Sequence, residues 1–403
     1  MSPRLLAVLA ILFLAPAIAL GTRHFEATNR IGVLCIGDTS YGESPVLGWL
    51  SLDFAVQWQE LPTDVGGVMS DADAKKVTRI YMPRTLERLL DAYDLILLLE
   101  PRMDWFGGIE MNRFKQSIED GVSCILTLWP DDEGYNSLVQ NEFASVFPQD
   151  FTPTFESVED VPFTVEVREG NPPVLTPFLP LSIERFTGHK TRPMHPRPGS
   201  RIWAVAKKPA MAKIPEDKFM ISWTYGEEDA ENWAVGVDVD ESWFTASGKN
   251  EYGGDILLNM IYYSVGKDIP TDVYLVHDLR NAFFQYSVQK KLIFAVIEFV
   301  DVFGANTGEL ERSIAEADRG RSIAEEAFLE ADYEGSYDQI RRMIDELAEL
   351  NERAIEIKDR ALLWVYVTEW SAVTGTAIMA GFTLYTLMVG RRLYREVSVT
   401  RES

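Results

Sequence analysis

Acidic and hydroxyl side chains follow several of the apolar runs that we expect to form strands. In a parallel sheet, ligands bind beyond the carboxyl ends of the strands. Carboxylates gathered there can bind a divalent cation, or can raise the pKa of one carboxyl group so that it serves in acid–base chemistry. Loop carboxylates that only stay solvated give the same pattern and are more common. The candidates for a ligand cleft are Asp38, Thr39, Ser40, Glu100, Trp129, Asp131 and Glu227.

Cys35 and Cys124 are the other residues with reactive chemistry, and they are the only cysteines in the chain. Each lies inside an apolar run that is typical of a strand, where a buried thiol is inert. We therefore expect two buried thiols, with a single bridge between them as the alternative. The sequence contains neither a Cys/His zinc spacing nor a phosphate-binding loop, so we predict no metal ligands and no cofactor, with a cation at the acidic strand ends as the alternative.

Buried strands that alternate with helices must hold these residues in place. Residues 31–37, 93–99 and 122–128 are nearly continuous apolar runs, as in strands that are covered on both faces of a parallel sheet. A helix is expected over 108–119, whereas residues 64–76 are polar and are interpreted as a loop. This alternation predicts right-handed βαβ units in a mostly parallel, doubly wound α/β sheet.

The α/β domain is expected to span residues 22–269. Residues 147–215 are rich in proline and have short apolar runs, which predicts a β insertion or a sheet edge. Strands are expected again at 219–225 and 233–239, followed by an apolar helix over 253–265.

The order of these elements, together with several short motifs, resembles that of a known superfamily over residues 30–268. The matching motifs are residues 31–37, residues 94–99, Asp120-Gly121-Val122 before the strand at 124–128, Tyr225-Gly226-Glu227, residues 235–239 with Trp243, and residues 257–263. They resemble the class I glutamine amidotransferase-like superfamily in its noncatalytic and trehalose-utilisation-like branches. The resemblance implies that superfamily's α/β fold.

The chain departs from the superfamily at the catalytic motif. Catalytic members carry Gly-x-Cys-x-Gly on a strained turn between strand and helix, and a distant histidine acts as the base. The matching strand end here reads Leu128-Trp129-Pro130-Asp131. Proline has no N–H to donate and tryptophan is no nucleophile. The expected His-x-Glu is also missing, since Asp238, Asp240 and Glu241 include no histidine. We therefore do not expect amidotransferase chemistry.

The chain from residue 270 to 360 is predicted to be helical. The helix expected over 277–303 has apolar residues that we interpret as core packing, namely Leu279, Phe283, Tyr286, Leu292, Val296 and Phe299. Residues 324–337 resemble one helix–turn–helix of a tetratricopeptide-type repeat, but roughly three such units are needed for a solenoid. We therefore expect a helical stalk or bundle, whose exposed faces suit a protein partner.

An uncharged apolar stretch over 370–389 has the length of a membrane span. Arg391 and Arg392 follow it, and Trp364 and Trp370 stand at its other end, which predicts a span over 361–390 with the tail 391–403 in the cytoplasm. Residues 1–21 read as a secretory signal peptide, with a retained signal anchor as the alternative. Both options place the α/β domain outside the cytoplasmic membrane.

Small residues within the span, among them Gly375 and Gly381, are placed so that two helices could approach closely. The same residues are common in spans that never pair, and the partner could equally be the helix of another subunit.

The formal net charge of −24 argues against nucleic acid, which would repel so acidic a chain. The function that we expect is that of a membrane-anchored, extracytoplasmic, noncatalytic binding or assembly protein of the cell surface. The alternative is a metal- or carboxylate-dependent hydrolase acting on a surface saccharide or peptide. A receptor that signals through the span is a third option, although the tail is short.

Overall fold

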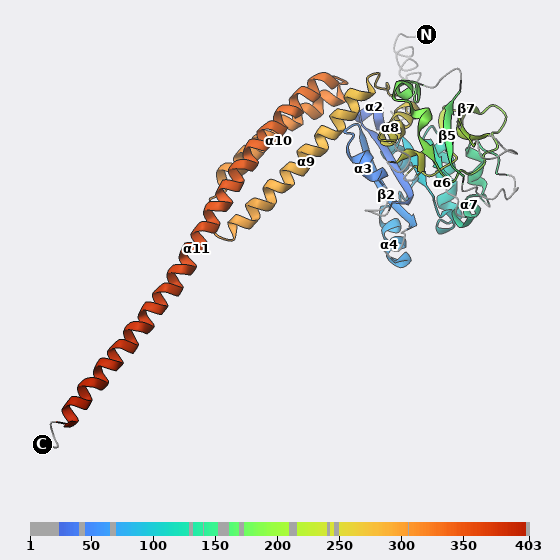
Figure 1. Ribbon diagram of the computed structural model, residues 1–403. Helices are drawn as coiled ribbons and strands as arrows, with labels where there is room; N and C mark the ends of the chain where they lie inside the picture. Colours follow the sequence, from blue (N-terminus) through green and yellow to red (C-terminus); the bar gives the residue numbers. More distant parts are fainter. Residues whose placement is uncertain are drawn as a thin grey trace, which may run out of the picture. The chain divides into compact units, whose positions relative to one another are not determined.

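The computed structural model describes residues 24–39, 45–64, 70–128, 132–139, 141–151, 161–168, 173–208, 216–239, 242–245, 250–304 and 306–399. These residues form two compact units. The α/β unit comprises the described residues up to Asn281 together with Glu325–Glu334. The helical unit comprises Ala282–Ala324 and the described residues from Gly335 onwards (Figure 1). The expected signal segment, residues 1–21, lies outside the described residues.

One nine-stranded sheet forms the centre of the α/β unit, in the order β2-β1-β3-β4-β9-β8-β7-β5-β6. The strands are β1 (Ile31–Asp38), β2 (Val56–Asp64), β3 (Leu95–Leu99), β4 (Ser123–Thr127), β5 (Phe163–Val167), β6 (Thr187–Gly188), β7 (Arg201–Lys207), β8 (Glu216–Tyr225) and β9 (Ala230–Val235). The apolar runs expected at 31–37, 93–99 and 122–128 supply β1, β3 and β4.

The sheet is mixed, which corrects the expectation of a mostly parallel one. Pairings from β2 through β1, β3 and β4 to β9 are parallel. Those from β9 through β8, β7 and β5 to β6 are antiparallel. The reason is local, because a tight turn joins β8 to β9 and leaves no room for a crossover helix. Gly226 (φ 82) and Asp229 (φ 53) supply the left-handed backbone of that turn.

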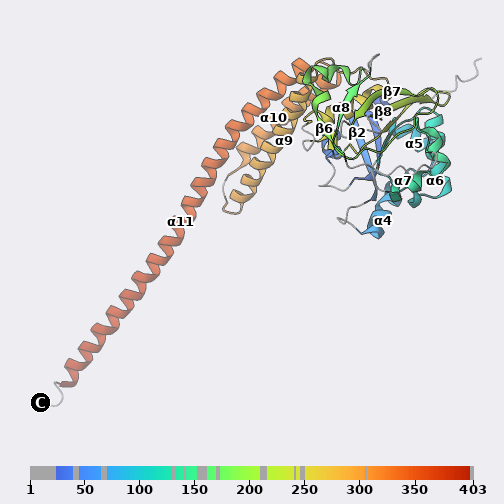
Figure 2. The same cartoon turned by 45° about the vertical axis from the view of Figure 1, so that its right-hand side comes forward.

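Helices cover both faces of the sheet, as in a doubly wound fold (Figure 2). They are α2 (His24–Thr28), α3 (Val46–Ser51), α4 (Asp71–Tyr81), α5 (Leu86–Ala92), α6 (Gly108–Glu119), α7 (Asp132–Val139) and α8 (Gly253–Ser264). Short 3-10 turns are η1 (Met103–Trp105), η2 (Glu142–Val146), η3 (Thr176–Leu181), η4 (Ile183–Arg185) and η5 (Ser242–Phe244).

Each sheet face has its own apolar core. On one face, Leu34, Leu98 and Leu126 belong to a buried cluster with Phe114 of α6 and Phe143 of η2. The opposite face packs against α8, where the Trp233 Nε1–H and the Ser123 hydroxyl both donate to Ser264, at 2.9 Å and 2.8 Å. Strands that are buried on both faces explain why the apolar runs show no alternation.

Helix α4 corrects the interpretation of residues 64–76 as a loop. The Ser70 side chain accepts a hydrogen bond from the Asp73 backbone N–H and caps the start of the helix. The Thr78 hydroxyl then donates to the Pro62 carbonyl at 2.8 Å, which fixes α4 against β2. The capping residue was present in the sequence, but the polar character of the segment concealed it.

The helical unit is an antiparallel arrangement of α9 (Val273–Asp301), α10 (Gly308–Leu329) and α11 (Tyr333–Val399), of which α9 begins in the α/β unit. Lys290 of α9 pairs with Asp318 of α10 at 2.6 Å, and the Ser336 hydroxyl of α11 donates to the Ala324 carbonyl of α10 at 2.7 Å. The last part of α11 continues alone beyond α9 and α10 (Figure 1).

The apolar residues expected to form the core of α9 divide between two faces. Leu279, Phe283 and Tyr286 are buried as expected, but Leu292 and Phe299 are 56% and 42% exposed. The expectation was wrong for these two residues, because α9 is apolar on more of its surface than its neighbours cover.

Candidate functional site

The strand order places a switch point between β1 and β3, where the chain turns to opposite sides of the sheet. The two strand ends are unusually close there. Gly37 has a φ of 133°, and a Cβ at this position would lie 1.7 Å from the Leu99 carbonyl oxygen. Glu100, directly after β3, also has a positive φ of 48°. The backbone at this edge of the sheet therefore has two positive φ angles and a close approach between the ends of β1 and β3.

Three of the residues predicted for a ligand cleft lie at this edge. Asp38 ends β1, Thr39 follows it and Glu100 follows β3. The Thr39 side chain is buried, and its hydroxyl has no hydrogen-bond partner within the described part of the chain. The backbone N–H of Arg102 donates to the Thr63 hydroxyl at 2.9 Å and ties the segment after β3 to the end of β2.

Glu227 lies elsewhere. It stands in the turn between β8 and β9, and β9 runs parallel to β4. The turn is therefore at the edge where the parallel strands begin, opposite to Asp38 and Glu100. Burial raises the pKa of Asp120, which precedes β4, and the charge of Glu227 contributes to the same shift. Glu227 therefore belongs to a different edge from the predicted cleft.

The remaining predicted residues, Ser40, Trp129 and Asp131, lie outside the described residues. Within the ranges that the structure describes, no three His, Cys, Asp or Glu side chains are grouped so that they could hold a metal ion. The described carboxylates at the sheet edge thus provide two members of the predicted set, Asp38 and Glu100.

Both thiols are unavailable for chemistry. Cys35 and Cys124 are free and fully buried, each within a strand. Burial raises the pKa of both thiols well above the ordinary value for cysteine, and the charge of Glu60 raises the pKa of Cys35 further. A thiol in this environment stays protonated at neutral pH and is a poor nucleophile.

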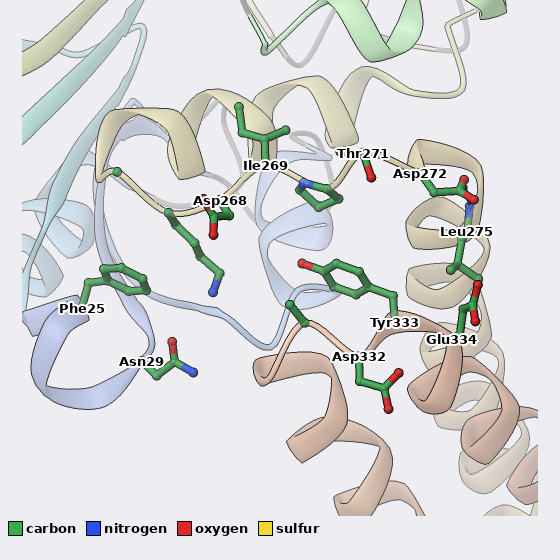
Figure 3. Close-up of a pocket in the computed structure, with 14 residues that line it drawn as sticks. Phe25, Asn29, Asp268, Ile269, Thr271, Asp272, Leu275, Asp332, Tyr333 and Glu334 are labelled. Atoms are coloured by element: carbon green, nitrogen blue, oxygen red, sulfur yellow. Dashed lines mark hydrogen bonds between the residues drawn. The ribbon is translucent and has the colours of Figure 1, made fainter.

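A pocket of about 710 Å³ opens elsewhere in the α/β unit, a size that suits a small ligand. Its walls come from α2 with the turn after it, the loop between α8 and α9, and the turn between α10 and α11. Figure 3 shows the Tyr333 ring reaching into this space, with Phe25 and Asn29 on the far wall and Asp332 turned away. The amide of Asn29 donates to the Leu329 carbonyl at 2.9 Å and holds the last turn in place.

Lys267 is the cation of this pocket. Its Nζ lies 5.2 Å from the ring centroid of Phe25 and 5.5 Å from that of Tyr262. Burial lowers the pKa of Lys267, although the charges of Asp53 and Asp268 oppose the shift. Burial also raises the pKa of Tyr333. An amine, a phenol and aromatic walls can together bind a polar small molecule.

A buried ionic network lies between α3, α8 and the start of α9. Arg280 donates to Asp53 and to Asp255, while the Tyr262 hydroxyl donates to Asp53 at 2.9 Å. His277 Nδ1 lies 2.7 Å from Asp255 Oδ2. Neither this network nor the Lys267 pocket was recognised in the sequence. Their members come from distant segments, and no short motif joins them.

The last part of α11 presents apolar side chains on every side. One window of this helix is long and apolar enough to cross a membrane by its length and composition, and none of it is buried. Trp364, Trp370 and Phe382 are each more than 60% exposed. A Cβ at Gly375 or Gly381 would meet open space, so both glycine faces are free. Their pairing with a second helix stays a prediction.

Comparison with known proteins gives little further guidance. No family model matches the chain, and no curated protein does. Among solved structures, the glutaminase domain of Trypanosoma brucei CTPS with bound acivicin matches at 12% identity and a TM-score of 0.30. The match covers 60% of this chain and 97% of that one. A TM-score this low carries no conclusion about fold or activity.

Proposed function

We propose that this protein is a membrane-anchored, extracytoplasmic binding or assembly protein of the cell surface that has no catalytic activity of its own. The observation that carries the proposal is the exposed apolar end of α11. Apolar patches larger than a few hundred Å² are rare on soluble monomers, whereas a bilayer accommodates about twenty such residues in one helix. Arg391 and Arg392 at the end of the apolar stretch favour the cytoplasm for the tail.

Binding rather than catalysis is supported by the state of the reactive side chains. Cys35 and Cys124 are buried and protonated, and the strand end at Leu128 continues into Trp129 and Pro130, which supply neither a nucleophile nor an extra amide donor. The Lys267 pocket and the exposed surface of the helical unit are the regions that suit a ligand and a protein partner.

Protease accessibility tests the topology. Protease added outside spheroplasts is expected to digest the α/β unit and to leave a small membrane fragment that carries a tag on the tail. A tag-bearing protein that stays at full length, while an outer-face control protein is digested, would overturn the extracytoplasmic assignment.

Thermal unfolding tests the absence of metal-dependent chemistry at the edge that carries Asp38 and Glu100. The melting temperature of the purified protein is expected to be the same with a chelator and with added Mg²⁺, Ca²⁺ or Zn²⁺. A rise with one ion that is lost in the Asp38→Asn variant would favour the hydrolase alternative instead.

A further inference from the structure

Helix α9 has two apolar faces, and only one of them is covered. The inner face packs within its own unit through Phe283, Tyr286, Ile293, Ile297 and Val300, all at most 5% exposed. The outer face carries a second set of large apolar side chains with high exposure. Its members are Phe284 (55%), Val288 (38%), Leu292 (56%), Phe299 (42%), and, just after the helix, Val302 (78%) and Phe303 (40%).

The spacing of this outer stripe is that of a coiled-coil seam. Val288, Leu292, Ala295, Phe299 and Val302 follow one another at alternating steps of four and three residues. This 3.5-residue repeat keeps one line of side chains facing a partner helix. From Phe284 to Phe299 the stripe runs roughly 22 Å along the helix at about 1.5 Å per residue, and Val302 and Phe303 continue it into the turn after Asp301. A helix that served only its own bundle would need one apolar face, not two.

We propose that the outer face of α9 with the turn after it, defined as Phe284 to Phe303, pairs in parallel with the same face of a second copy of this chain. The parallel direction rests on the proposed function, because copies anchored in one membrane by α11 share one orientation. A two-fold axis along the membrane normal then brings identical stripes together in a self-complementary contact. Confinement to the membrane also raises the effective concentration of the partner.

The side chains of the stripe fit such a pair. In a parallel pair each residue of the seam meets its own copy, so the small Ala295 layer lies between the larger layers of Leu292 and Phe299. Large and small layers in alternation allow the helices to interdigitate. The exposed Ala295 leaves the space that the neighbouring Phe299 side chains need.

The charges beside the stripe do not oppose this pairing. Lys291 and Glu298 flank one side of the seam, and the other flank carries the uncharged residues Gln289, Val296 and Phe303. In a parallel coiled coil, one flank of each helix faces the opposite flank of its partner. Neither Lys291 nor Glu298 therefore faces a like charge across the seam.

Cysteine cross-linking of the full-length protein, in native membranes and in detergent, tests the proposal. Leu292→Cys and Phe299→Cys are each expected to form a disulfide-linked homodimer under mild oxidation. Glu316→Cys on α10, whose native side chain is 70% exposed, is the matched control and is expected to stay monomeric. The native thiols are buried and do not contribute to the reaction.

Several results would overturn the pairing. These are no homodimer at either seam position, equal cross-linking at Glu316→Cys, or cross-linking to a different protein. A homodimer at Ala295→Cys but at neither flanking position would indicate an antiparallel pair, and would also contradict the proposal. The Leu292→Glu/Phe299→Glu double variant supplies a second readout. Its dimer dissociation constant in detergent is expected to be at least tenfold higher than that of the wild type, while its melting temperature stays the same.

The two proposals fail separately. If protease shows a cytoplasmic α/β unit but the seam still cross-links in detergent, the extracytoplasmic assignment is lost and the dimer stands. If the seam does not cross-link while the topology is as expected, the anchored binding protein stands without this interface.

Discussion

Nη2 of Arg280 lies 2.5 Å from Oδ2 of Asp53, although the two residues are 227 positions apart in the chain. Both side chains are buried, at 5% and 0% exposure. The same guanidinium also pairs with Asp255, so that one cation compensates two carboxylates. Burial alone would lower the pKa of Arg280, but the two carboxylates outweigh it and raise the pKa. This network fastens the first turns of α9 to α8 and to the segment between α3 and β2.

Arg280→Met is expected to destabilise the α/β unit strongly. The variant leaves the buried carboxylate of Asp53 without its ion-pair partner and Asp255 with His277 alone, and breaking a buried ion pair costs about 3–5 kcal/mol. Arg319→Met is the matched control, because its ion pair with Glu316 is 75% and 70% exposed and such pairs contribute about 0–1 kcal/mol. Urea unfolding of both purified variants measures the difference. Similar midpoints for the two would show that the buried network contributes no more than a surface pair.

The stability of the α/β unit is expected to fall as the pH rises above about 6.5, the ordinary value for histidine. The hydrogen bond to Asp255 raises the pKa of His277, an effect that outweighs burial. A raised pKa means that the stabilisation is fully present below the unfolded pKa and is lost as the pH passes through the folded pKa. Asp255 titrates at much lower pH, since His277 and Arg280 together outweigh burial and lower its pKa.

His277→Gln is expected to remove this part of the pH dependence. Unfolding free energies of the two proteins between pH 6 and pH 9 provide the comparison, and the wild type should lose more stability over this range than the variant. Parallel curves for the two proteins would assign the pH dependence to other groups.

Gly37→Ala is expected to destabilise the protein by at least about 2 kcal/mol, through left-handed strain and overpacking. The new methyl group would collide with the Leu99 carbonyl at the junction of β1 and β3. Gly48→Ala is the control, since Gly48 lies in α3 with open space around it, and helix propensity predicts a gain of about 0.5–1 kcal/mol. The melting temperature should fall for Gly37→Ala and rise for Gly48→Ala. A change in the same direction for both variants would contradict the geometry described for this junction.

Cys124 is expected to resist a polar maleimide in the native protein and to react after denaturation. Its thiol is fully buried in β4, and burial raises its pKa. Cys124→Ser should lower stability by about 1–3 kcal/mol, because the hydroxyl is less tolerant of an apolar site. Mass spectrometry of timed labelling gives the rate. Labelling of native Cys124 as fast as that of the exposed Glu316→Cys variant would refute the buried assignment.

The sequence determined those elements whose signal is local. Continuous apolar runs were sufficient for β1, β3 and β4, because strands covered on both faces need apolar residues at every position. The uncharged stretch over 370–389 likewise marked the apolar end of α11. Its signal is local, because length and composition alone decide whether a helix can cross a membrane.

Only the tertiary structure decided relationships between distant segments. Periodicity shows that α9 is apolar, but whether Leu292 faces a core or solvent depends on where α10 and α11 pack. The turn between β8 and β9 makes these two strands antiparallel and places Glu227 at the opposite edge of the sheet from Asp38, although both residues stand at strand ends in the sequence. Arg280 and Asp53 meet because α9 returns to α3, and pairing across 227 positions leaves no trace in local spacing or composition.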